Sequence, residues 1–385
     1  IIDNINKKKY MMTKEKDNKS KDICIITNIG THYRYTIYQE ISKEFPCDFY
    51  LGDQVQTPIK TFDYSSLQGY KKTLKNKFFH HFYWQKGSVS LIGKSYKFYI
   101  LDGEPYCLSS WVILLLAKIT KKETIAWTHG WYGRESAIKK YIKKIFYSMH
   151  DKLLVYNEYA IRLMKENGIK NQMFCIANSL DSDKEKEIRN NTHYTNVYVS
   201  HFQNSAPTII YCGRIQKWKK LEMVVDAIAL LKNQGIQINA VFVGKDVEEV
   251  KLEEYAKKQQ VEQQIWMYGP CYDDNTLGEL FYNAQVCVSP GNVGLTAIHA
   301  LTFGCPVITH GNYPYQGPEF EAIRPNITGD FFKQDDIADL TNKIKKWICL
   351  NPEEREHVRQ SAYDEIDRKW NIHEQIKTIR KAIYG

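Results

Sequence analysis

Two stretches in the second half of the sequence carry residues suited to binding a diphosphate. The first is GRIQKWK (213–219), which follows a predicted strand and contains Arg214 and Lys219. At the carboxyl end of a strand, an arginine offers a two-pronged donor to phosphate and a lysine offers a point charge. Lys217 and Lys220 lie close enough in sequence to compete with Lys219. The motif alone therefore indicates a phosphate site without deciding which lysine serves it.

The loop PGNVGLT (290–296) is a second candidate for contact with phosphate. It joins a predicted strand (286–289) to a predicted helix, so the N–H groups of Gly294, Leu295 and Thr296 have no partner within that helix. The positive end of the helix dipole favours an anion at this position. The alternative is that the glycines serve only a tight turn. Together the two stretches indicate a diphosphate site more strongly than either does alone.

Three loops in the first half carry polar side chains, and each follows a predicted strand. From THYRY, DGEPY and WTHGWYGRES they supply His32, Tyr33, Arg34, Glu104 and His129. We expect the first four to contact an acceptor at the edge of a cleft. One alternative is that Tyr33 and Tyr35 simply begin a helix, and another is that His129 has a packing role.

Other catalytic and metal-binding motifs are missing from the sequence. It contains no H-E-x-x-H, C-x-x-C, G-x-S-x-G, G-x-G-x-x-G or Walker lysine motif. The triplet DSD (181–183) superficially resembles a metal-binding Asp-x-Asp, but no nucleotide-binding strand precedes it. We therefore expect no metal site.

The composition is that of a soluble globular protein with room for two domains. The chain has 385 residues, of which 43% are hydrophobic and 25% charged. Its nine scattered cysteines favour reduced thiols over a disulfide framework. The polar, lysine-rich residues 1–21 lack the apolar core of a secretory signal and predict a disordered tail. The longest apolar run, 108–117, is too short to cross a bilayer and predicts a buried helix.

Positive charge is concentrated in the first half. Residues 1–181 hold 29 Lys and Arg against 17 Asp and Glu, a net +12, and the remainder holds 24 against 27, a net −3, which sum to +9. Much of the excess lies in a predicted helix, AIKKYIKKIFYSM (137–149), where lysines adjoin an apolar stripe. One interpretation is that the lysines form a solvated face while the apolar stripe packs on the core. The other is that the lysines attract anionic membrane headgroups or a phosphorylated lipid. No nucleic-acid motif accompanies the lysines, so no nucleic-acid partner is expected.

Short β-type runs alternate with helical periodicity in both halves, which predicts parallel sheets with helices on both faces. The fold class predicted is therefore α/β, with two doubly wound domains facing a central cleft that the carboxyl ends of the strands line. The predicted parts are a tail (1–21), a first domain (22–181), a linker (182–207), a second domain (208–365) and a final helix (366–385).

The second half resembles the retaining GT-B glycosyltransferases of group 1, which use nucleotide-sugar donors. The resemblance rests on the order and spacing of five segments between about residues 208 and 350: TIIYCGRIQKWKKLEMVVDAIALL, VFVG, WMYG, LFYNAQVCVSPGNVGLTAIHALTFGCPVI and PEFEAIRPNITGDFF. The first half matches more loosely, through KLLVYNEYAIRLMKENGI and IANSLD. The resemblance implies two Rossmann-like domains, the first binding the acceptor and the second the donor, with the final helix returning to the first.

The resemblance also implies roles for individual residues. Arg214 and Lys219 would neutralise the donor diphosphate, His129 would approach the transferred sugar, and Glu319 or Glu321 would be the acidic residue near it. The donor would further be held by Gly213, Tyr268, Pro270, Gly294, Leu295, Thr296 and His299.

The sequence departs from this family at two positions. The family usually has two glutamates eight residues apart around the glycine loop, and these positions are Gly291 and His299 here. A neutral imidazole both accepts and donates a hydrogen bond, so His299 could still bind ribose hydroxyls. Glycine cannot hold a donor sugar. We therefore expect that Glu319 or Glu321 takes over this role, or that the donor sugar is different or bound differently.

These observations predict a retaining, metal-independent glycosyltransferase, hexosyl or related. It would move a sugar from a UDP- or GDP-type donor to a hydroxyl of a lipid-linked glycan in bacterial surface polysaccharide or glycoconjugate synthesis. No cofactor is expected beyond this co-substrate. The expected location is cytoplasmic, with the basic first domain at the inner face of the membrane. The alternatives are a GT-B-fold nucleotide-sugar epimerase and a catalytically silent binding protein.

Overall fold

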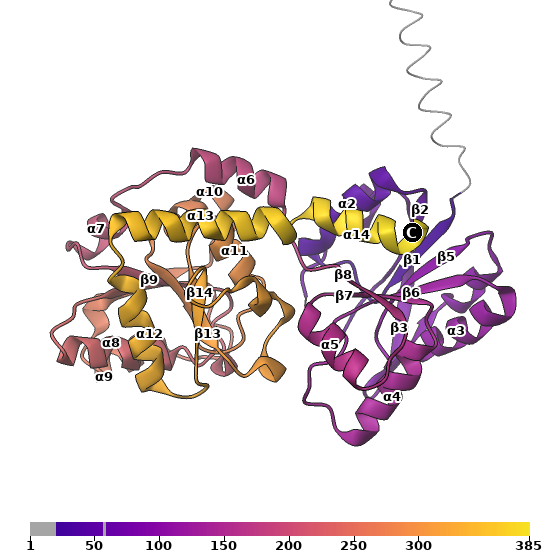
Figure 1. Cartoon of the computed structure of the whole chain (residues 1–385), viewed down its shortest axis with the longest axis horizontal. Coiled ribbons are helices and arrows are strands. Elements are labelled where there is room, and N and C mark those ends of the chain that lie inside the picture. The colour runs from indigo at the N-terminus through magenta and orange to yellow at the C-terminus, as the bar shows by residue number, and fades with distance from the viewer. Residues whose placement is uncertain (1–20, 57–58) are drawn as a thin grey trace, which may run out of the picture.

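The computed structural model describes residues 21–56 and 59–385, which form two α/β domains side by side (Figure 1). The predicted disordered tail (1–21) lies outside the described residues except for Lys21. All nine cysteines are free thiols. Within the described part of the chain, no helix has the length and apolarity that a bilayer crossing needs.

The first domain is built on an eight-stranded sheet. Its strands are β1 (Ile23–Thr27), β2 (Cys47–Gly52), β3 (Tyr70–Phe79), β4 (Phe82–Lys86), β5 (Phe98–Asp102), β6 (Glu123–Thr128), β7 (Lys152–Val155) and β8 (Gln172–Cys175). The spatial order is β4-β3-β2-β1-β5-β6-β7-β8, and every neighbouring pair is parallel except β3 and β4. The order reverses direction at β1, so the loops after β1 and β5 lie on either side of a crevice.

Helices cover both faces of this sheet. One face packs against α3 (Leu108–Thr120), α4 (Ala137–Ser148) and α5 (Glu158–Glu166). The other packs against α2 (Tyr35–Glu44) and the last helix of the chain, α14 (Ile372–Tyr384). The hairpin of β3 and β4 is rich in lysine and aromatic residues.

The second domain repeats the architecture with six parallel strands. They are β9 (Thr208–Cys212), β10 (Asn239–Val243), β11 (Ile265–Gly269), β12 (Val286–Ser289), β13 (Val307–His310) and β14 (Gly329–Phe332). Their order is β11-β10-β9-β12-β13-β14, which reverses between β9 and β12. The Arg214 loop and the glycine loop follow these two adjacent strands. The predicted fold class, two doubly wound α/β domains, is confirmed.

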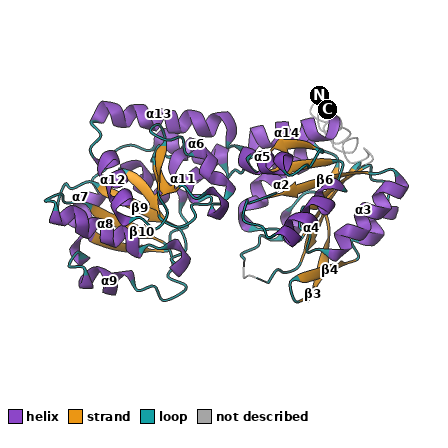
Figure 2. Cartoon of the chain, turned by 60° about the horizontal axis from the view of Figure 1, so that its bottom comes forward, coloured by secondary structure: helices purple, strands orange, loops and turns teal. Residues whose placement is uncertain are grey.

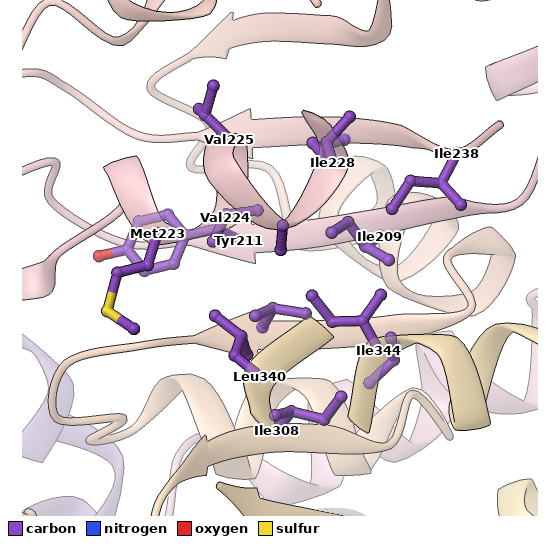
Figure 3. Packing of buried hydrophobic residues seen from close by; sticks show 14 of the residues in the cluster. Ile209, Tyr211, Met223, Val224, Val225, Ile228, Ile238, Ile308, Leu340 and Ile344 are labelled. Atoms are coloured by element: carbon purple, nitrogen blue, oxygen red, sulfur yellow. The ribbon is translucent and has the colours of Figure 1, made fainter. Parts of the chain in front are cut away.

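Two apolar layers hold the second sheet. One face packs against α8 (Glu222–Asn233), α9 (Leu252–Lys258) and α12 (Ile337–Ile348), where Ile209, Ile228 and Ile344 interdigitate (Figure 3). The other packs against α10 (Asp274–Asn283), α11 (Thr296–Thr302) and α13 (Pro352–Lys369).

The predicted linker (182–207) is not an extended connection. It forms α6 (Ser182–Asn191) and α7 (Val197–Phe202), which contact α10 and, for α6, also α11. Asp181 caps α6, accepting from the Lys184 N–H at 3.5 Å. The high charge density of this segment, which favours a linker, arises because most α6 side chains face solvent. Glu185 and Arg189 are buried and anchor the inner face of α6.

The segment from 352 onward is two helices rather than one. The helix α13 ends at Trp370, which is fully buried in the second domain, and Asn371 caps α14. The expected final helix (366–385) thus spans the end of α13 and all of α14, which contacts α2 of the first domain (Figure 1).

Two adjacent leucines on α8 provide a test of the second core. Leu231 is 0% exposed and Leu230 is 39% exposed. We expect Leu231→Ala to lower the free energy of unfolding by about 2–5 kcal/mol, because the cavity it leaves cannot collapse fully. Urea unfolding of the second domain, followed by circular dichroism, measures the change. Leu230→Ala is the matched control, with an expected loss below about 1 kcal/mol; equal losses would contradict this description of the core.

Candidate functional site

The loops at the carboxyl edges of the two sheets contact one another. Arg134, in the loop after β6, has its guanidinium carbon 4.9 Å from the ring centroid of Tyr315, which follows β13. Asn178, beyond β8, donates through Nδ2 to Glu319 Oε1 at 2.8 Å. Candidate residues from both halves of the sequence therefore lie at one junction.

Lys219 links the two stretches that the sequence marked for phosphate. Its side chain is buried, and Nζ donates to the carbonyl oxygen of Asn292 at 2.6 Å and to Asn292 Oδ1 at 3.1 Å. Burial, followed by the nearby Arg214 guanidinium, lowers the pKa of Lys219 to about 8. Lys217 is exposed and Lys220 pairs with Asp335, so of the three competing lysines Lys219 is the one held against the glycine loop.

The start of α11 lies directly against the loop after β9. Thr296 Oγ1 donates to the carbonyl oxygen of Cys212 at 2.9 Å, and a Cβ on Gly213 would lie 3.7 Å from that hydroxyl. Gly294 has a φ of +57°, in the left-handed region where glycine is least strained. The structure therefore brings Gly213, Gly294, Leu295 and Thr296 together. Arg214 is exposed, and its guanidinium has no hydrogen-bond or ion-pair partner among the described residues.

Gly291, where the resemblance places a glutamate, has no space for a side chain. Its N–H donates to the carbonyl oxygen of Lys219 at 3.0 Å. A Cβ at this position would lie 2.5 Å from the Trp218 carbonyl oxygen and 2.8 Å from Lys219 Cα. The close approach of these two backbones therefore accounts for the glycine.

The two acidic candidates after β13 have different surroundings. Glu319 is buried, accepts from Asn178, and lies near enough to Lys219 for that ammonium to favour its charged form. Burial nevertheless raises the pKa of Glu319 above its ordinary value. Glu321 instead accepts from the N–H groups of Glu158 (3.0 Å) and Tyr159 (2.5 Å) at the start of α5. Glu321 thus joins the domains, and Glu319 is the carboxylate beside the phosphate candidates.

His299 contacts a carboxylate rather than open solvent. Its Nδ1 lies 3.0 Å from Glu185 Oε1, and 22% of its side chain is exposed. Burial lowers the pKa of His299 to about 4 and raises the pKa of Glu185 to about 8. Although it lies this close to Glu185, the buried Nδ1 forms no hydrogen bond within the described residues.

Tyr268 and Pro270 lie at the end of β11, the edge strand of the second sheet. Tyr268 is half-buried, with its ring centroid 5.1 Å from that of Trp266, and Pro270 is exposed. Neither residue forms a hydrogen bond with Lys219.

The first domain contains two cavities that share Glu104 and His129. One, of about 450 Å³, adds Tyr132, Arg134, Lys139 and Lys143; the other, of about 330 Å³, adds Tyr33 and Arg34. His32 is exposed and lines neither.

The polar groups of these cavities are strongly affected by burial. Burial and the neighbouring Asp102 raise the pKa of Glu104 to about 7. Burial lowers the pKa of His129 to about 4, so its ring is neutral near pH 7. Arg34 donates to Tyr38 at 3.2 Å and to Tyr156, and lies 3.9 Å from Asp102. Because these contacts occupy its guanidinium, Arg34 forms part of the cavity wall.

Sequence reasoning missed three residues of the site: Asn178, Glu185 and Asn292. Asn292 lies inside the quoted glycine loop, and its amide side chain was the available signal. Asn178 and Glu185 are distant in sequence from their partners, and no local pattern links them. Among the described residues, no three His, Cys, Asp or Glu side chains gather closely enough to hold a metal ion.

Comparison with known proteins gives a family match for the second half of the chain and similar folds among solved structures. Residues 195–365 match the family model described as glycosyl transferases group 1. A search of curated proteins finds no match. Among solved structures, the UDP complex of Alr3699/HepE from Anabaena is similar with a TM-score of 0.68 at 12% identity, over 94% of this chain and 99% of that one.

Two further structures show the same likeness. A glycosyltransferase from Rickettsia africae ESF-5 has a TM-score of 0.69 at 15% identity, over 94% of this chain and 98% of that one. The apo form of WaaB, a lipopolysaccharide outer core galactosyltransferase, has a TM-score of 0.67 at 13% identity, over 94% and 99%. The fold is therefore that of the GT-B glycosyltransferases, and the family model matches the second domain together with the helix before it.

The burial of Glu185 predicts a dependence of stability on pH. The pKa of Glu185 is about 8 in the folded chain and about 4.3 when unfolded. Between these values the folded state holds the extra proton, so the contribution of Glu185 to the unfolding free energy falls as pH rises toward 8. We expect Glu185→Gln to flatten this slope between pH 5 and 8, measured by urea unfolding. Glu187→Gln, an exposed change on the same helix, should leave the slope as it is, and an unchanged slope in Glu185→Gln would contradict the assignment.

Proposed function

We propose that this protein is a glycosyltransferase that moves a sugar from a nucleoside diphosphate donor to a hydroxyl of a lipid-linked glycan. The observation that carries the proposal is the contact of Lys219 with Asn292, because it holds a lysine of the first phosphate-directed stretch against the loop of the second. The group 1 family match over the same domain supports transferase chemistry.

In the proposed mechanism the leaving diphosphate is stabilised by charge. The bond from the anomeric carbon to the diphosphate oxygen breaks, and negative charge develops on that oxygen. Lys219, the exposed Arg214 and the N–H groups of Gly294 to Thr296 would take up this charge in a partly buried site, where such interactions are strong. With these cations in place, the proposal requires no divalent metal.

For the donor we propose a UDP-type sugar, with a GDP-type sugar as the alternative. HepE was solved with UDP and with UDP-glucose, and TarM from S. aureus with UDP and a glycosylated glycerol. Tyr268 and Pro270 would flank the base, and His299 Nε2 would accept from a ribose hydroxyl. Thermal-shift measurements with UDP, GDP, TDP and CMP test the base, and the largest stabilisation identifies it.

Glu319 is proposed as the carboxylate that holds the donor sugar. Gly291 cannot carry one, and Glu321 is engaged at the start of α5. Buried and hydrogen-bonded to Asn178, Glu319 presents its remaining lone pairs beside Lys219, where a sugar attached to the diphosphate would lie.

The acceptor is proposed to enter the cavities of the first domain. Glu104 and His129 belong to both cavities, and neutral His129 can donate to or accept from a sugar hydroxyl. The hydroxyl oxygen attacks the anomeric carbon and loses its proton as the diphosphate leaves. Retention, bacterial surface glycan synthesis and a cytoplasmic location belong to the same proposal. Proton NMR of the product's anomeric configuration tests retention.

Removing Lys219 should impair transfer strongly. We expect Lys219→Ala to lower kcat/KM for sugar transfer by about 10²- to 10³-fold, since a buried charge at the leaving group is lost. In the unchanged protein kcat/KM should fall as pH rises through about 8, where free Lys219 loses its proton. Mass spectrometry of the glycosylated product gives the rates. Lys217→Ala, on an exposed neighbour, is the matched control, and an isomerised donor without a new linkage would favour the epimerase instead.

The two glutamates should separate chemistry from stability. We expect Glu319→Gln to lower kcat by about tenfold or more with little change in Tm. Glu321→Gln should instead cost about 1–3 kcal/mol of stability, because one oxygen is lost as acceptor for the α5 amides. Transfer assays and thermal unfolding of both variants make the comparison. A larger catalytic loss in Glu321→Gln would show that the assignment is reversed.

A further inference from the structure

The apolar stripe of α4 faces solvent, not the core. Ile138, Tyr141, Ile142 and Ile145 lie at i, i+3, i+4 and i+7, the spacing of a core-facing stripe, yet each is between 39% and 73% exposed. The interpretation of this helix as a solvated lysine face over a core stripe is therefore wrong. Phe146 and its neighbour Tyr147 are the residues that α4 buries.

The adjacent helix α3 has an exposed apolar stripe of its own. Leu108, Leu115 and Ile119, at i, i+7 and i+11, are between 39% and 76% exposed. The two helices touch through Trp111 and Phe146, whose ring centroids lie 5.0 Å apart. Both helices cover the same face of the first sheet, and Figure 2 shows them in the same domain. We call these seven side chains the apolar surface: Leu108, Leu115, Ile119, Ile138, Tyr141, Ile142 and Ile145.

The charged side chains that α3 and α4 themselves carry are all positive. Neither α3 nor α4 contains an Asp or Glu residue. Lys118 on α3 and Lys139 and Lys144 on α4 are exposed, and Lys140 is half-buried. Lys143 is turned inward, 2.8 Å from Glu135 Oε1, so it belongs to the acceptor cavity.

The apolar surface adjoins the larger cavity of the first domain. Lys139 and Lys143 line that cavity from one side of α4, and Arg134 lines it from the preceding loop. The outer side of the same helix carries Ile138 and Tyr141. A molecule anchored in a surface that α4 contacts could therefore extend directly into this cavity.

We propose that the apolar surface docks on an anionic lipid bilayer, with Ile138, Tyr141 and their neighbours entering the headgroup region. Apolar side chains bordered by lysines, on helices that lie flat, are the features that bind a helix to such an interface. A second copy of this chain is the rival occupant, but a twofold contact would oppose lysines to lysines with no acid on either helix. Docking would place the cavity, with its three cationic residues, at the phosphate level of a lipid acceptor. Only this last step rests on the proposed function.

The test measures vesicle binding by the full chain without any donor. We expect cosedimentation with vesicles of phosphatidylcholine and phosphatidylglycerol, and at least tenfold weaker binding to phosphatidylcholine alone. Ile138→Asp with Ile145→Asp should lower binding to the anionic vesicles at least tenfold, and Lys140→Glu with Lys144→Glu should do the same. Leu230→Asp, at a second-domain site as exposed as Ile145, is the matched control and should bind as the unchanged protein does.

Two further measurements separate the outcomes. Unchanged Tm and nucleotide binding would show that the variants are folded. If the unchanged protein binds vesicles but has no transferase activity, the docking proposal stands and the proposed function is wrong. Failure of the unchanged protein to bind anionic vesicles would overturn the proposal. So would a dimer, seen by light scattering, that the Ile138 and Ile145 changes dissociate.

Discussion

The site depends on one short 3-10 segment, Pro318–Ala322, that fastens the carboxyl edges of the two sheets to each other. A 3-10 helix has about three residues per turn, so side chains two residues apart point in different directions. Glu319 is therefore directed toward Asn178 and Lys219, and Glu321 toward the amides at the start of α5. One carboxylate holds the domains together, which frees the other for the cleft.

A second constraint explains why the glycine loop departs from the pattern of the family that the sequence resembles. At position 291 the backbones of two loops approach so closely that only glycine fits. At position 299 a glutamate would lie beside buried Glu185, and two carboxylates at that distance cannot both be charged without a large cost. A histidine, which is neutral here near pH 7, brings no second negative charge to this contact. Both departures are thus consequences of packing around the loop.

The first domain shows how one helix can serve two surfaces. On α4, Lys143 is held inside by Glu135 and the carbonyl oxygen of Gly130, while the apolar residues lie outside. In most amphipathic helices the apolar stripe faces the core. On α4 this stripe faces solvent, and Phe146 and Tyr147, near the end of the helix, are the residues that it buries. A large exposed apolar area on a folded chain generally marks an interaction surface.

The sequence by itself determined the alternation of strands and helices, the two doubly wound domains and the stretches around Arg214 and Gly294. These follow from hydrophobic periodicity and from glycine and charge at strand ends, which are local properties. The tertiary structure decided which lysine meets the glycine loop, which glutamate faces the cleft, that residues 182–207 fold into helices, and which side of α4 faces solvent. Each of these four outcomes depends on partners distant in sequence, such as Asn292, Asn178 and Glu185. A periodic pattern shows that one face of a helix is apolar, but it does not show what covers that face.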